Sequence, residues 1–153
     1  MLGLAKRNIE KEYLNAQREI DNVLLTAYEI EIIQNILNEN DKVDGIYINF
    51  CNPWPKPRHN KKRLTHPKQL QKYKVFLKQD GEIYFKTDDD GLFNASIKYF
   101  EEEGFEIVSK TYDLHKEPIW KNNIETEHEK MFEEQGIKTK ALIALKRGTY
   151  LNL

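Results

Sequence analysis

The sequence of 153 residues lacks features that several classes of protein require. It has one cysteine, Cys51, which cannot form a disulfide within the chain or a cysteine-based zinc site. It also lacks a signal peptide and an apolar run of about 18 residues, so we expect a cytoplasmic protein with no membrane span. His115 and His128 stand without other ligand types at a useful spacing, so we expect no metal site.

Acidic residues are absent from one long stretch of the chain. Residues 45–79 contain no Asp or Glu but nine Lys and Arg, although the net charge of the whole sequence is only −1. A basic stretch in a nearly neutral chain indicates a local surface for an anionic partner, not a basic tail. An ordinary solvated surface is the alternative interpretation.

The basic stretch begins with a short run of β-branched and aromatic residues, 46–50, which predicts a strand. Three prolines within residues 53–57 then exclude a regular strand or helix. Aromatic rings stack on bases and cations pair with phosphates, so this loop predicts contact with RNA. The residues that would make such contacts are Trp54, Lys56, Arg58, His59, Lys61, Lys62 and Arg63.

The apolar periodicity of the remaining chain alternates between that of helices and that of strands. Expected helices cover residues 2–20, 30–37, 67–79, 90–103 and 126–134. Expected strands cover residues 23–27, 46–50, 82–87, 105–111 and 137–146. This order predicts an α/β fold, namely a single domain over residues 1–153 with a mostly parallel sheet and helices on both faces.

Three polar clusters fall at the ends of expected strands or in loops: residues 52–63, 87–90 and 126–129. In sheets of this kind, ligands bind beyond the carboxyl ends of the strands. We therefore expect the three clusters to converge on one cleft. For Asp88, Asp89 and Asp90, capping of the following helix is an equally good explanation.

Four segments make a resemblance to a known family specific. Asn-Phe-Cys-Asn-Pro-Trp-Pro-Lys-Pro-Arg-His at 49–59, residues 62–65, Phe-Lys-Thr-Asp at 85–88 and Thr-Glu-His-Glu at 126–129 resemble signature blocks of bacterial tRNA (guanine-N7)-methyltransferases. The resemblance covers nearly the whole chain, in order. It implies a class I, Rossmann-like fold and transfer of a methyl group from S-adenosylmethionine to N7 of a guanine in the tRNA variable loop.

The resemblance also implies roles for single residues. Substrate contacts fall on Lys56, Asp88, Thr126, Glu127, His128 and Glu129. Asn52 takes the catalytic and donor-contacting position, where the family usually has Asp, and Thr26 stands near another donor-contacting position. Guanine N7 attacks through a free lone pair, so no general base is required, and an Asn amide can both donate to and accept from a guanine.

The chain lacks the glycine-rich turn with which class I methyltransferases hold their donor, because it contains no Gly-x-Gly. By the resemblance, Met1 falls past the second strand of the family. The first two strands and the main donor site are therefore expected to be missing, which leaves residues 23–27 without neighbouring strands. The alternatives are a non-catalytic RNA-binding remnant and a chain that another polypeptide completes.

Overall fold

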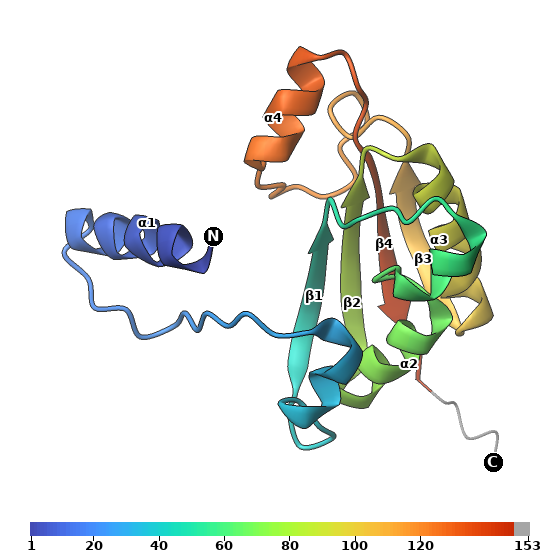
Figure 1. The fold of residues 1–153 in the computed structure, drawn as a ribbon, viewed down its shortest axis with the longest axis horizontal. Coiled ribbons are helices and arrows are strands. Elements are labelled where there is room, and N and C mark those ends of the chain that lie inside the picture. The colour runs from blue at the N-terminus through green and yellow to red at the C-terminus, as the bar shows by residue number, and fades with distance from the viewer. Residues whose placement is uncertain (149–153) are drawn as a thin grey trace. The chain divides into compact units, whose positions relative to one another are not determined.

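The computed structural model describes residues 1–148 (Figure 1). In chain order the elements are α1 (Leu2–Asn15), the 3₁₀ helix η1 (Ile30–Asn35), β1 (Val43–Asn49), the 3₁₀ helix η2 (Pro57–Lys62), α2 (Pro67–Phe76), β2 (Leu77–Thr87), α3 (Asp90–Glu102), β3 (Phe105–Thr111), α4 (Glu127–Glu134) and β4 (Lys140–Lys146). Residues 1–33 form one compact unit, and a second unit begins at Gln34. The single-domain assignment stays a prediction. None of the helices within residues 1–148 is long and apolar enough to cross a membrane.

The unit of residues 1–33 departs from the prediction in two places. The first helix ends at Asn15 instead of residue 20, because Gln17 adopts a φ of 53°, outside the helical region. The strand expected at 23–27 is wrong: this segment has no regular secondary structure, and Leu24 is fully exposed. A strand requires a hydrogen-bonded neighbour, and none of the strands in residues 1–148 pairs with this segment.

The second unit contains a four-stranded sheet in the order β1-β2-β4-β3. β1 and β2 are parallel, whereas β4 runs antiparallel to both of its neighbours, β2 and β3. The mostly parallel sheet is therefore confirmed in part, since three strands share one direction and β4 is inserted between them in reverse. The parallel register sets Ile48 beside Phe85 and Asn49 beside Lys86.

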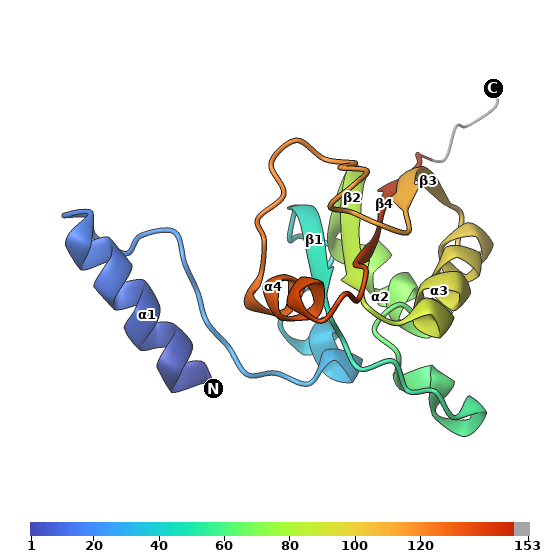
Figure 2. The same ribbon diagram turned by 90° about the horizontal axis from the view of Figure 1, so that it is seen from above.

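The two faces of this sheet differ because side chains alternate along a strand. Ile83 and Phe85 are buried on the face that α3 covers, where the ring of Phe85 lies 6.3 Å from that of Phe93. α2 contacts α3, and Figure 2 shows both on one side of the sheet. The opposite face bears Tyr84 and Lys86, and the segment 120–126 lies against it. Within the described part of the second unit, α2 and α3 pack against one face and a loop lies against the other, so the expected helices on both faces are not found there.

Local capping signals fix where the helices around the site begin. The side chain of Asp89 accepts a hydrogen bond from Leu92 N (2.6 Å) at the start of α3. Thr126 and Glu129 form a reciprocal capping box at the start of α4. Figure 1 shows α4 above the carboxyl ends of β1 and β2, and the rings of His128 and Phe132 lie 5.8 and 5.7 Å from that of Phe50.

Candidate functional site

The first two predicted clusters lie side by side at the carboxyl ends of β1 and β2. Phe50 N donates to Lys86 O (2.9 Å), which continues the strand pairing, and a φ of 51° at Phe50 then turns the chain. Burial raises the pKa of the Cys51 thiol to about 11, and the nearby carboxylate of Asp88 adds to the increase. Cys51 is therefore a neutral, partly buried thiol and not a nucleophile at neutral pH.

Asn52 begins a tight turn whose polar side chain remains exposed. Its Oδ1 accepts a hydrogen bond from Trp54 N (3.1 Å), and Trp54 adopts a φ of 43°. Within residues 1–148, no hydrogen-bond partner is found for Asn52 Nδ2. The turn thus fixes the carboxamide through its oxygen and presents its two N–H donors to a ligand.

Arg63 has a role that the sequence did not reveal. Its side chain is buried; Nε donates to Pro53 O (2.9 Å), and the two terminal nitrogens donate to Trp54 O (3.4 Å) and to the Tyr99 hydroxyl (3.2 Å). The guanidinium therefore holds the Asn-Pro-Trp turn against α3. All three guanidinium nitrogens of Arg63 thus donate to groups of the protein itself. The contact between Arg63 and RNA stays a prediction.

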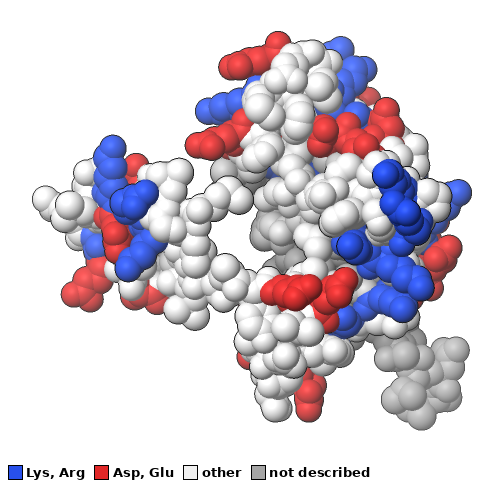
Figure 3. Space-filling view, viewed as in Figure 1, with Lys and Arg blue, Asp and Glu red and all other residues white. Residues whose placement is uncertain are grey.

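The remaining cations of the cluster are exposed. Three of them, Arg58, Lys61 and Lys62, lie in η2, and Lys56 directly precedes it; these four are called the cations of η2 below. Figure 3 shows Lys and Arg side chains gathered over η2 and α2. Lys62 Nζ lies 4.8 Å from the centroid of the Trp54 ring, and His59 meets the same ring edge-on at 5.6 Å. The half-buried Trp54 ring therefore contacts one cation and one imidazole of the cluster.

The pKa of His66 is lowered by its surroundings, which include this basic surface. Burial lowers the pKa of its imidazole, and the nearby charges of Lys68, Lys61 and Arg63 lower it further. Its Nδ1 accepts a hydrogen bond from Lys68 N (3.2 Å) at the start of α2. His66 is thus a neutral cap with cationic side chains nearby.

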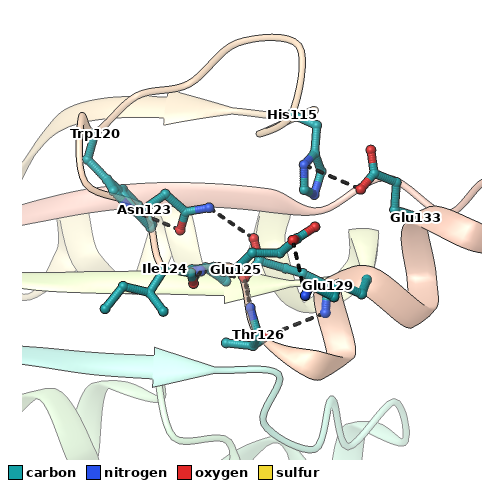
Figure 4. Close-up of polar contacts among 10 residues, drawn as sticks. His115, Trp120, Asn123, Ile124, Glu125, Thr126, Glu129 and Glu133 are labelled. Carbon is teal, nitrogen blue, oxygen red and sulfur yellow. Dashed lines mark hydrogen bonds and ion pairs between the residues drawn. The ribbon is translucent and has the colours of Figure 1, made fainter. Parts of the chain in front are cut away.

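The third predicted cluster is divided between buried and exposed residues. Glu129 is completely buried and pairs with Lys86 at 2.5 Å, whereas Glu127 and His128 are exposed on α4. Burial raises the pKa of Glu129, but hydrogen bonds from Lys86, from Thr126 N and from Asn123 outweigh it and hold the pKa below its ordinary value. Figure 4 shows Glu129 where α4 meets the loop that carries Trp120 and Asn123.

A pocket of about 530 Å³ opens beside this buried pair. Its walls include the stacked rings of Tyr47 and Tyr84, with centroids 4.6 Å apart, and Trp120 edge-on to Tyr84 at 5.4 Å. A hydrogen bond to Glu82 raises the pKa of Tyr84 to about 12, so its ring is neutral at physiological pH. Asn49, Lys86 and Thr126 contribute to the lining, whereas Asn52 and Asp88 do not, so this pocket is distinct from the strand-end cluster.

Two other sequence predictions concern the donor and metals. Thr26 lies in the unit of residues 1–33, in an exposed segment without regular secondary structure. Within residues 1–148, a group that could hold a metal ion is formed by His115, Glu125 and Glu133, whose ligand atoms lie within 4.8 Å of one another. All three residues are exposed, and the absence of a metal site stays a prediction.

Comparison with known proteins assigns the chain to a family. A family model described as a putative methyltransferase matches residues 3–142. The chain belongs to this family. The resemblance recognised in the sequence blocks and the methyltransferase-like fold are therefore confirmed.

Curated relatives of this chain carry a more specific name. A protein of Clostridium beijerinckii is 62% identical over 146 residues, which are 95% of this chain and 66% of the relative. A protein of Acetivibrio thermocellus is 54% identical over 147 residues, which are 96% of this chain and 67% of the relative. Both are named tRNA (guanine-N(7)-)-methyltransferase. The chain spans about two thirds of the length of the curated relatives it matches.

A solved structure supports the fold alone. The complex of the Haloferax volcanii Trm112 methyltransferase activator with a putative methyltransferase contains a chain that aligns with a TM-score of 0.53 at 10% identity. The alignment covers 90% of this methyltransferase-family chain and 67% of the other chain.

Proposed function

We propose that this chain is the tRNA-binding and guanine-positioning part of a tRNA (guanine-N(7)-)-methyltransferase that uses S-adenosylmethionine. One observation carries the proposal. The exposed Asn52 lies near Asp88, and the exposed cations of η2 follow Asn52 directly in the chain. The identity of the chain to relatives with this name, 62% in one case, supports the methyltransferase over a non-catalytic RNA-binding remnant.

The strand-end residues are suited to hold a guanine. Asn52 Nδ2 donates to O6 of the base, while the carboxylate of Asp88 accepts from its N1–H, so both groups orient the ring and leave N7 free. N7 carries no proton, so no residue of the site has to remove one. The chain then contributes to catalysis by positioning the nucleophile.

The exposed cations of η2 are suited to the tRNA backbone. Lys56, Arg58, Lys61 and Lys62 pair with phosphates, and the half-buried Trp54 and His59 shape the surface between them. Arg63 supports the turn from inside, because its donors already contact Pro53, Trp54 and Tyr99. Glu127 and His128 close the other side of the site from α4.

S-adenosylmethionine supplies the methyl group in such a reaction, but the residues present do not fit it well. The sequence contains no Gly-x-Gly turn, and Thr26 lies in an exposed segment without regular structure. In our proposal the binding of RNA by this chain does not depend on S-adenosylmethionine.

The proposed contact between Asn52 and guanine predicts an effect that depends on the base. Asn52→Ala should weaken binding of an unmodified tRNA transcript by about 1–2 kcal/mol, the range of a good base contact. The same substitution should leave binding unchanged when the variable-loop guanines of the transcript are replaced with adenine, which lacks O6. Fluorescence anisotropy with both transcripts measures the coupling.

Asn52→Asp is the matched control, because its carboxylate still accepts from Trp54 N but cannot donate to O6. It separates the loss of the base contact from the loss of the turn. An equal loss of affinity for both transcripts in Asn52→Ala would show that the residue stabilises only the loop.

A further inference from the structure

Lys86 is a buried lysine at the carboxyl end of β2, and the proposed reaction does not use it. Its side chain is 4% exposed, and its Nζ lies 2.5 Å from Glu129 Oε2. The same ammonium donates to Ile124 O (3.0 Å) and lies 5.6 Å from the centroid of the Trp120 ring. Because the ammonium is buried among Glu129, Ile124 and Trp120, Lys86 cannot pair with a phosphate in solvent.

Glu129, the partner of Lys86, connects three segments of the chain. Besides the ammonium from β2, its carboxylate accepts hydrogen bonds from Thr126 N (2.9 Å) and from Asn123 Nδ2 (3.1 Å). Asn123 in turn accepts a hydrogen bond from Trp120 Nε1 (3.0 Å). One buried carboxylate thus joins β2, the loop 120–126 and the first turn of α4 (Figure 4).

The same bonds decide which residues of the run 126–129 are available to a ligand. Thr126 Oγ1 accepts from Glu129 N (3.2 Å), so the polar atoms of Thr126 and Glu129 serve the capping box. Glu127 and His128 lie between them and are exposed, and the His128 ring stacks on Phe50 at the end of β1. The orientation of this exposed pair therefore depends on the anchor below it.

We propose that Lys86 is a positioning residue that acts through Glu129. It orders the segment 120–129 and thereby holds Glu127 and His128 over the guanine site. Glu129 is then an internal anchor and not a contact of the RNA. The inference rests on the proposed function, because it assigns the ordered segment to the tRNA site.

The first test measures order in the segment without RNA. The double variant Lys86→Met/Glu129→Met replaces the ion pair with apolar side chains of similar length, a change that buried pairs often tolerate. In hydrogen–deuterium exchange of the 153-residue chain, amides of residues 120–129 should exchange at least roughly tenfold faster, while those of β2 and β4 remain protected. Unchanged exchange in the segment overturns the proposal.

Two further variants keep this test decisive. Lys78→Met removes an exposed lysine of the same strand, paired with Asp44, and should leave exchange in residues 120–129 unchanged. If the double variant fails to fold, Asn123→Ala removes one bond to the same carboxylate from the loop side. The same acceleration is expected in Asn123→Ala, and its absence overturns the proposal.

The second test measures binding of an unmodified tRNA transcript over a range of salt concentrations. A positioning role predicts that the dissociation constant of the double variant rises about fivefold, the low end of coupling between linked sites. The slope of log K against log salt should not change, because no phosphate contact is lost. A slope reduced by about one would reveal a direct phosphate contact of Lys86 and overturn the positioning role.

An unchanged affinity in the double variant also overturns the inference. If the wild-type chain itself binds no tRNA, the proposed function fails, whereas the exchange experiment still shows whether Lys86 orders the segment. The two failures are therefore distinguishable.

Discussion

Lys86→Met is expected to lower the free energy of unfolding by about 3–5 kcal/mol at neutral pH, the usual cost of stranding one member of a buried ion pair. The substitution leaves the completely buried carboxylate of Glu129 without its cation. It also removes the donor to Ile124 O. Urea unfolding followed by circular dichroism gives the free energy directly.

The loss should depend on pH in a defined direction. In the wild-type chain, burial raises the pKa of Glu129, but the hydrogen bonds from Lys86, Thr126 N and Asn123 lower it below its ordinary value of 4.5. A lowered pKa in the folded state stabilises the fold above pH 4.5, and this stabilisation disappears as the pH falls further. In Lys86→Met the buried carboxyl is most stable when protonated, so the difference between the two proteins should shrink in acid.

Lys78→Met is the control, because its pair with Asp44 is exposed and contributes about 1 kcal/mol or less at any pH. A loss in Lys86→Met as small as that of the control would contradict the anchoring role of Lys86. A loss that is the same at pH 3 and pH 7 would contradict the pairing with an ionised Glu129.

Simultaneous replacement of the four exposed cations of η2 with alanine is expected to weaken tRNA binding about 100-fold or more at low salt. Each cation that pairs with a phosphate adds roughly one to the salt slope, so Lys56→Ala/Arg58→Ala/Lys61→Ala/Lys62→Ala should reduce the slope by about three to four. Titrations of an unmodified tRNA transcript at several salt concentrations measure both quantities.

The control for this variant removes the same charge elsewhere. Lys78, Lys110, Lys116 and Lys138 are exposed and lie outside η2, so replacing all four with alanine should lower the affinity only slightly. Both variants should unfold close to the wild-type transition, since exposed substitutions change stability little. Equal losses of affinity in the two variants would show that only net charge matters and that η2 is not the RNA surface.

The parts of the fold that the sequence predicted are those that local chemistry determines. The helices expected to begin at residues 67, 90 and 126 begin at Pro67, Asp90 and Glu127, and the residue before each of them supplies a side-chain cap. The end of β1 before the proline-rich loop is also a local signal. These signals place Asn52 and Asp88 directly after two strands, β1 and β2, which are neighbours in the sheet.

Asp80 and Gly81, which lie between the expected helix 67–79 and the expected strand 82–87, show how strand pairing modifies a local turn signal. β2 already begins at Leu77, and the register with β1 shifts between Val43–Leu77 and Gly45–Glu82. Asp80 adopts a φ of 58°, and a Cβ at Gly81 would lie 2.7 Å from the Leu77 side chain. The turn residues therefore produce an irregularity inside a longer strand, where they had been expected to separate a helix from a strand.

The parts that sequence reasoning missed depend on contacts between distant segments. Lys86 and Glu129 are 43 positions apart, so no local pattern identifies them as partners. Arg63 appeared as one more cation in a basic run, although its guanidinium reaches Tyr99, 36 positions away. A charged residue inside an alternating apolar strand, as at Lys86 after Phe85, is the one signal in the sequence that could have indicated a buried charge, although it does not identify the partner.

Dimethyl sulfate probing tests the proposed guanine site most directly. This reagent methylates accessible guanine N7 atoms in RNA, so it reports the environment of N7 in the bound tRNA. Binding of the 153-residue chain to an unmodified tRNA transcript should change the reactivity of a guanine in the variable loop more than that of any other guanine. The variant lacking the four η2 cations should abolish this change. Equal changes across the tRNA, or none in the variable loop, would contradict the proposed guanine site.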